Sequence, residues 1–478
     1  MHEALGDVLD RFAGEVFNAN GTDGHGDSTE ALRSVAGGSR KGMSDIGDKL
    51  RDLLAKHRVM TGAQLASRQQ ERERRCQAGE LEVEKVVPGE IVGEPDNRFF
   101  LVREDFPLET RQGEVALGAV LDAIPEHIAL SACDAELEVF DPATALFMDT
   151  ETTGLAGGSG TVAFLVGVGY FVEGVFRLEQ CFMRDYDEEE PMLRYLDGLF
   201  LRCETVVSYN GKSFDMPLLR TRFIQNRLPF RLDGALHFDL VHAARRFWKK
   251  RLGDCSLSNV ERAVLGVERH GDIPSSEIPQ LWFDYLRTRD ATELQRVFYH
   301  HKMDVLSLVS LTALLSKRIE ASDGEGFQHA EDRLSLARLY FRQKQFENVV
   351  AHVGGLLETE TEPVIRRECL ELMAYASKRL DEWQRMEDAW TAVLREFPRN
   401  LAARAELAKF YEHRKRDLPA AKRICEETIQ FLETRAALGQ DADLDLDHAE
   451  SFRYRLNRIQ RKLSRAYGGG DDFPPEDE

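Results

Sequence analysis

The stretch Ala145-Leu-Phe-Met-Asp-Thr-Glu-Thr-Thr-Gly154 decides the fold of this 478-residue chain. Four apolar residues precede Asp149 and Glu151, a pattern that predicts a buried strand ending at the surface. Residues i and i+2 of a strand point to the same face, so both carboxylates project together. They repel each other, and a bound hard cation such as Mg²⁺ or Mn²⁺ would keep both ionised. A lone Asp-x-Glu is also typical of a solvated strand end, so the interpretation depends on the sequence that follows.

The sequence after this stretch predicts an α/β domain over residues 136–320. Residues 162–171 and 175–183 are expected to complete an antiparallel meander, with Glu173-Gly174 as the tight turn. A helix over 188–201 and a strand over 205–209 follow, and then helices near 214–226, 239–250, 256–265, 278–287 and 291–319. This order is that of a ribonuclease H-like domain, a mixed sheet flanked by helices. The run 157–160 lacks the Lys-Ser/Thr of a phosphate loop and is predicted to be a hairpin connection.

Two further acidic motifs lie downstream of the first pair. In Tyr209-Asn-Gly-Lys-Ser-Phe-Asp215, the aspartate begins a helix after a strand, where it is either a metal ligand or a helix-dipole partner. In Tyr299-His-His-Lys-Met-Asp304, His300 and Asp304 are four residues apart and share a helix face. Each motif alone has an ordinary structural explanation.

Together and in this order, the three motifs resemble those of the DEDD, or DnaQ-like, 3′→5′ exonuclease superfamily. A closer resemblance is to its YprB-like branch. That closer match is carried by His237–Leu240, Arg245–Trp248, Leu257–Arg262, His270–Pro274 and Tyr299–Leu306. The resemblance implies that Asp149, Glu151, Asp215 and Asp304 are catalytic acids that bind two Mg²⁺ or Mn²⁺ ions. It also implies hydrolysis of phosphodiester bonds from single-stranded 3′ ends.

The general base departs from the best-known members, which place histidine five residues, or tyrosine four residues, before the last aspartate. Here Tyr299 stands at the fifth position and His300 at the fourth. Residues i and i+4 stack directly along one helix face, so the spacing favours His300, with Tyr299 as the alternate. Imidazole titrates near neutral pH, which suits proton abstraction from water. His301 is expected to point elsewhere.

Basic residues are concentrated near the motifs, although the chain carries a net charge of −20. Segment 212–251 holds ten Lys or Arg against three acids, whereas the overall charge argues against non-specific coating of nucleic acid. The expected nucleic-acid contacts are Asn210, Lys212, Arg245, Arg246, Lys249 and Lys250, with stacking on Phe247 or Trp248. Helical periodicity also places at least one of these aromatics in the core. Asn210-Gly211 is equally consistent with a simple turn, and Asp239 is expected to cap the next helix.

The rest of the chain divides by composition. Residues 1–85 are expected to be a partly disordered arm with amphipathic helices at 4–17 and 44–58, and 86–135 a small β-rich segment. Residues 328–467 are expected to be all-α, with weak tetratricopeptide-like (TPR-like) repeats that bind a protein partner. The tail, 468–478, is acidic and expected to be disordered.

Composition also limits the alternatives. No apolar run reaches the length of a membrane span, and the seven scattered cysteines indicate free thiols in the cytoplasm. Two other functions compete with exonuclease action. One is a structure-specific endonuclease or RNase H-like enzyme, and the other is a non-catalytic nucleic-acid-binding scaffold. The sequence leaves open whether the substrate is DNA or RNA.

Overall fold

The computed structural model describes residues 62–154, 160–321, 326–438 and 442–467. The chain divides into two compact units, 1–77 and 78–478. In the first unit, α3 (Gly62–Gln77) is a largely exposed, mixed-charge helix. The expected helices at 4–17 and 44–58, most of the run 157–160 and the tail 468–478 lie outside the described residues.

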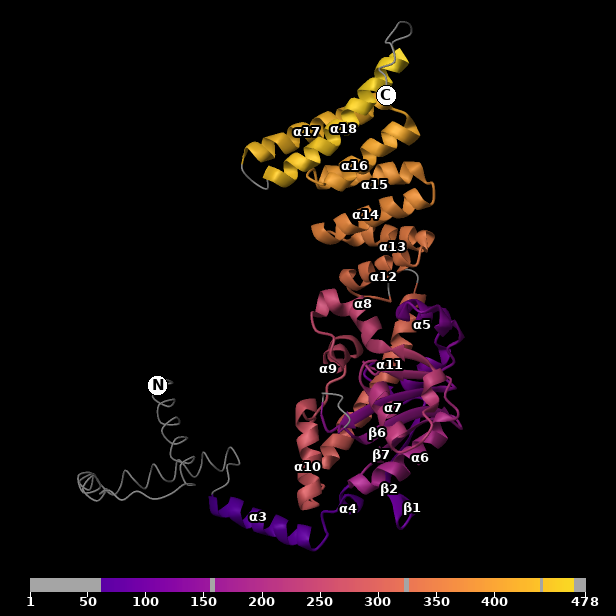
Figure 1. Ribbon diagram of the computed structural model, residues 1–478, viewed down its shortest axis with the longest axis vertical. Coiled ribbons are helices and arrows are strands. Elements are labelled where there is room, and N and C mark those ends of the chain that lie inside the picture. Colours follow the sequence, from indigo (N-terminus) through magenta and orange to yellow (C-terminus); the bar gives the residue numbers. More distant parts are fainter. Residues whose placement is uncertain (1–61, 155–159, 322–325, 439–441, 468–478) are drawn as a thin grey trace, which may run out of the picture. The chain divides into compact units, whose positions relative to one another are not determined.

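A seven-stranded mixed sheet forms the α/β part of the second unit (Figure 1). The predicted meander is present as β5 (Ala145–Thr152), β6 (Ala163–Val172) and β7 (Val175–Phe182), all antiparallel neighbours. The short strand β8 (Thr205–Ser208) then pairs parallel to β5. The ribonuclease H-like fold class predicted from this order is confirmed.

The two edges of the sheet hold strands that the sequence did not assign to it. At one edge, β1 (Glu90–Glu94) pairs with β2 (Asn97–Pro107), and β2 pairs antiparallel with β7. Within the segment expected to be β-rich over 86–135, residues 90–107 therefore extend this sheet, whereas 117–122 and 125–132 are helical. At the other edge, β9 (Leu236–Asp239) pairs parallel to β8. The sequence did not predict the four-residue strand β9. The full order is β1-β2-β7-β6-β5-β8-β9.

Helices cover both faces of the sheet, and the phase of β5 decides which face the acids join. Leu146 and Met148 belong to one core with α6 (Glu189–Phe200) and α7 (Asp215–Gln225). Ala145 and Phe147 belong to the opposite core, with α8 (Leu240–Leu252) and the second half of α11 (Leu294–Glu320). Asp149 and Glu151 are in phase with Phe147, so they emerge on the α11 face.

Smaller elements complete the α/β part. They are α4 (Val83–Val86), β3 (Arg111–Gln112), β4 (Val115–Ala116), α5 (Pro125–Ala132), α9 (Leu257–Val260) and α10 (Ile278–Thr288). The expected helix 256–265 is present only as α9 followed by a π-helical turn, Glu261–Leu265.

The remainder of the described chain is helical, as predicted. Its helices are α12 (Ala330–Arg342), α13 (Phe346–Thr359), α14 (Pro363–Arg379), α15 (Trp383–Glu396), α16 (Leu401–Phe410), α17 (Leu418–Ala437) and α18 (Ala442–Tyr467). A π-helical turn, Tyr411–Lys415, follows α16 and ends the helix expected over 400–413. An ion pair joins α8 to α12, with 2.8 Å between Arg251 Nη2 and Asp332 Oδ2.

Across the described ranges, no helix has both the length and the apolar character required to cross a membrane.

Candidate active site

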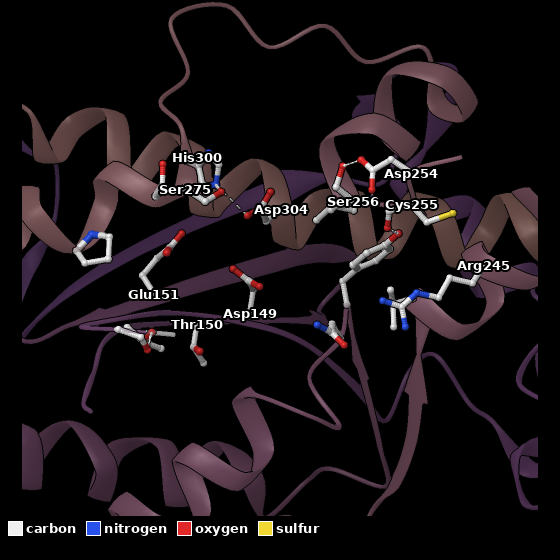
Figure 2. Close-up of a pocket in the computed structure, with 18 of the residues that line it drawn as sticks. Asp149, Thr150, Glu151, Arg245, Asp254, Cys255, Ser256, Ser275, His300 and Asp304 are labelled. Carbon is white, nitrogen blue, oxygen red and sulfur yellow. Dashed lines mark hydrogen bonds and ion pairs between the residues drawn. The ribbon is translucent and has the colours of Figure 1, made fainter. Parts of the chain in front are cut away.

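The carboxylates at the end of β5 line a cavity of about 630 Å³ that His300 and Asp304 also line (Figure 2). Potential ligand atoms of Glu151, His300 and Asp304 all lie within 4.8 Å of one another. Asp215, the first residue of α7, accepts a hydrogen bond from Thr150 Oγ1, beside Asp149. Two elements distant in sequence, β5 and α11, therefore bring Asp149, Glu151, His300 and Asp304 to one cavity. Asp215 of α7 does not line this cavity, although its charge acts on Asp149 and Glu151.

The electrostatics of these acids fit a divalent cation. Burial, followed by repulsion from Asp304 and Asp215, raises the pKa of Asp149 and of Glu151 well above the usual carboxyl value. Burial also raises the pKa of Asp215 to about 6, although the Thr150 hydrogen bond opposes this shift. Buried carboxylates that repel one another cost stability when ionised, and a hard cation removes that cost. Carboxylate oxygens suit Mg²⁺ or Mn²⁺.

His300 occupies a well-defined position beside the acids. Its Nε2 lies 3.3 Å from Asp304 Oδ2 and 3.2 Å from Ser275 Oγ. Its Nδ1 lies 2.8 Å from Asp272 Oδ1. Burial raises the pKa of Asp272, but the attraction of His300 and its hydrogen bond lower this pKa. The net result is a pKa below the usual carboxyl value. Tyr299, by contrast, is half-buried and is not one of the residues that line the cavity.

Arg269 also contacts the site, although the sequence analysis gave this residue no role. Its side chain is 7% exposed and forms an ion pair with Asp304. It also pairs with the buried Glu261, with 2.8 Å between Arg269 Nε and Glu261 Oε2, and with Asp272 at 3.2 Å. Arg269 thus holds the side chain of Asp304 and supplies a permanent positive charge. The sequence signal was weak, since Arg269 and Asp272 resemble ordinary charges around a Gly271 turn.

His301 contacts the backbone of Asp149, whereas the sequence analysis expected its side chain to point elsewhere. The ring is fully buried, and Nε2 lies 3.0 Å from the backbone oxygen of Asp149 while Nδ1 lies 3.0 Å from Gln180 Nε2. Burial lowers the pKa of His301 to about 4, so the ring is neutral at pH 7. Gln180 donates to Nδ1, and Nε2–H therefore donates to the Asp149 carbonyl. Gly167, opposite Asp149 on β6, leaves room for this ring: a Cβ there would lie 2.5 Å from His301 Cε1. A glycine inside a strand was the available signal.

Three of the six expected nucleic-acid contacts line the cavity: Asn210, Arg245 and Lys249. Figure 2 shows Arg245 on the far side of Asp149 from Glu151, on the same side as Asp254.

The other three expected contacts lie elsewhere. Lys212 is exposed and lines a separate cavity of about 280 Å³. Arg246 Nη1 donates to the backbone oxygen of Ser131 at 2.7 Å. Lys250 Nζ lies 3.4 Å from Glu368 of α14. These three side chains therefore do not share the cavity with Asn210, Arg245 and Lys249.

The loop before α7 is built around Asp239. The carboxylate accepts hydrogen bonds from the backbone N–H groups of Asn210 (2.7 Å) and Lys212 (3.1 Å). It also caps α8 by accepting from Val241 N at 3.2 Å, which confirms the predicted cap. Asn210 is left-handed, with φ of 69°, a conformation that asparagine tolerates. The Asn-Gly pair is therefore a turn that presents Asn210 to the cavity.

The sequence analysis expected a substrate base to stack on Phe247 or Trp248. The structure contradicts this expectation. Both side chains are buried in the core between the sheet and α8, because the helical period of α8 points them inward. Tyr209 is the aromatic side chain that lines the cavity, and its hydroxyl donates to the backbone oxygen of Cys255 at 2.7 Å.

Comparison with known proteins agrees with this fold. The sequence profile of the RNase_H superfamily matches residues 146–316. The chain is also 30% identical over 380 residues to the uncharacterized protein YprB of Bacillus subtilis (strain 168). That match covers 77% of this chain and 87% of YprB.

Proposed function

Because this chain belongs to the family of YprB and carries a domain of the RNase H superfamily, we propose that it is a metal-dependent nuclease. More narrowly, we propose a DEDD-type enzyme that hydrolyses phosphodiester bonds 3′→5′ from single-stranded ends. One observation carries the proposal. The carboxylates of Glu151 and Asp304 and the imidazole of His300 lie within 4.8 Å of one another, and Asp149 lines the same cavity.

The four acids would hold the divalent ions. Asp149 and Glu151 come from a rigid central strand, and Asp215 is fixed by Thr150. Arg269 limits the rotation of Asp304. When bound, Mg²⁺ or Mn²⁺ supplies charge stabilisation for the scissile phosphate and for the leaving 3′ oxygen.

His300 would accept the proton of the attacking water at Nε2, the ring nitrogen beside Asp304. Asp272 accepts the Nδ1–H and so fixes the ring orientation and its tautomer. The paired carboxylate also stabilises the imidazolium that forms. Asp272 is therefore a positioning residue, because it acts through His300.

Two basic side chains of the cavity would position the strand. Arg245 and Lys249 provide positive charge for phosphate groups, while the ring of Tyr209 faces the same cavity. A single strand fits such a site better than a duplex because its bases are free to stack. We also propose that the helical part is TPR-like and offers contacts to a protein partner.

A cleavage assay with end-blocked oligonucleotides tests the direction and mode of action. With Mn²⁺, a labelled single strand blocked at its 5′ end should be shortened, whereas a 3′-blocked strand should stay intact. Cleavage of a strand blocked at both ends would replace exonuclease action with endonuclease action. No cleavage of any strand, with binding unchanged by Asp149→Asn, would refute the enzyme in favour of a scaffold.

The His300→Ala variant tests the proton acceptor. Its rate should fall by ~10²–10⁴ while Mn²⁺ still binds, since general-base catalysis contributes about this factor. Asp149→Asn and Asp304→Asn should lose metal as well as activity. Calorimetric titration with Mn²⁺ separates the two classes, and loss of Mn²⁺ binding in His300→Ala would contradict the assignment.

A further inference from the structure

The second half of α18 carries a concentration of positive charge in this acidic chain. Residues 453–467 contain six Lys or Arg and no acid. Arg453 is paired with Glu433 of α17. We call the remaining five the α18 basic face: Arg455, Arg458, Arg461, Lys462 and Arg465.

Three members of this face converge on one buried acid. Glu412, in the π-helical turn after α16, is fully buried, and its carboxylate lies 2.8 Å from Arg455 Nη1 and 2.8 Å from Lys462 Nζ. Arg458 Nη2 lies 2.6 Å from the same carboxylate. One negative charge cannot neutralise three positive charges, so the cluster keeps an excess of about two charges. Arg458 is 38% exposed and Lys462 41%, and this excess therefore reaches the solvent.

The other two members add charge without local compensation. Arg461 and Arg465 are exposed, and neither forms an ion pair with any residue in the described ranges. At 3.6 residues per turn, the five basic positions and Tyr454 fall within an arc of about 120°. They therefore form one continuous stripe along α18, the last helix drawn as ribbon in Figure 1.

Helix-dipole compensation does not explain the stripe. The favourable effect of cations falls off within the last turn of a helix. Arg455 and Arg458 lie two or more turns before Tyr467, the last residue of α18. If Glu412 only stabilised the fold, one or two basic partners would be sufficient, so a structural role does not explain all three.

An aromatic ring lies within the basic stripe. Tyr454 is 72% exposed, which is unusual for so large a side chain, and it stands one helical turn before Arg458. Cations that contact phosphates, interleaved with an exposed ring on which a base can stack, are the features of single-strand binding surfaces.

We propose that the α18 basic face, with Tyr454, binds single-stranded nucleic acid and forms a second anchoring surface on the helical part. Charge complementarity selects a polyanion, and the exposed ring favours a polyanion with flat bases over an acidic protein. The inference rests on the proposed function only in taking nucleic acid as the substrate class. Binding to this surface requires no catalytic metal.

The test measures binding of a fluorescein-labelled single strand to the full chain by fluorescence anisotropy in EDTA. The double variant R461E/R465E should weaken binding on the order of tenfold, equally for strands of different sequence. It should also reduce the slope of log Kd against log salt by roughly 1.4, at ~0.7 for each phosphate contact. Tyr454→Ala should weaken binding about fivefold or more through lost stacking.

The matched control is R395E/R399E, which makes the same change in net charge at two exposed arginines outside the stripe. It should bind as the unaltered chain does, and circular dichroism should show that all variants are folded. Unchanged affinity in R461E/R465E, or equal weakening in the control, would overturn the proposal. Competition by polyglutamate as strong as that by an unlabelled oligonucleotide would also overturn it, in favour of an acidic protein.

Cleavage in Mn²⁺ is measured separately on the same preparations. An unaltered chain that binds through α18 but never cleaves would refute the nuclease and leave this surface standing. A chain that cleaves while R461E/R465E binds normally would refute only the surface.

Discussion

Replacing Asp215 with asparagine should stabilise the metal-free protein. Asp215 is 9% exposed, and burial raises its pKa to about 6 from the ordinary value near 3.8. The folded state therefore binds the proton more tightly than the unfolded state. The stability contributed by this group is present below pH ~4 and is lost as the pH rises through ~6.

The magnitude follows from the size of the shift. A difference of about two pKa units corresponds to about 3 kcal/mol at pH 8, at ~1.36 kcal/mol per unit. At pH 4 the same calculation leaves only about 0.5 kcal/mol. Asparagine keeps an oxygen that accepts from Thr150 Oγ1, so Asp215→Asn removes the charge with little loss of packing. In EDTA the variant should gain about 3 kcal/mol at pH 8 and almost nothing at pH 4.

Hydrogen exchange of the backbone amides in β5 and β8, corrected for intrinsic rates, measures this gain separately from the helical part. Asp122→Asn is the matched control, because Asp122 is exposed and should change stability by less than ~0.5 kcal/mol. Added Mn²⁺ should protect the unaltered chain more than Asp215→Asn. A variant that is no more stable at pH 8, or whose gain is independent of pH, would refute the reasoning.

Three further substitutions test the neighbours of the acids. Arg269→Met should destabilise the chain by about 3–5 kcal/mol because it leaves Glu261 buried without a positively charged partner, and R269M/E261Q should recover much of this loss in urea unfolding. Asp272→Asn should lower activity about 10–100-fold and alter the pH–rate profile while circular dichroism stays unchanged, and an unaltered profile would exclude a positioning role. Gly167→Ala should cost about 1–3 kcal/mol in thermal unfolding because the new methyl group meets His301, whereas Gly198→Ala, with open space around it, should not.

The sequence alone determined the central strands, most of the helices and the acids. A buried run that ends in Asp-x-Glu, a helix that begins with Asp215 and a His300/Asp304 pair on one helix face are local patterns, because strand and helix periodicities fix which side chains share a face. The order of these elements was sufficient to predict the ribonuclease H-like fold and the helical part that follows. Asp239 as a helix cap was predictable for the same local reason.

Only the tertiary structure decided which side chains meet. The segment between α9 and α10 brings Glu261, Arg269 and Asp272 to the site. His301 contacts Asp149 because Gly167 lets α11 approach the sheet. Arg245 and Arg246 are neighbours in sequence, yet one lines the cavity and the other binds a backbone oxygen. The local sequence indicates which side chains share a face of one helix or strand, but it does not indicate how close two distant segments lie in the fold. The convergence of three basic side chains on Glu412 is visible only after α18 has packed against the turn that follows α16.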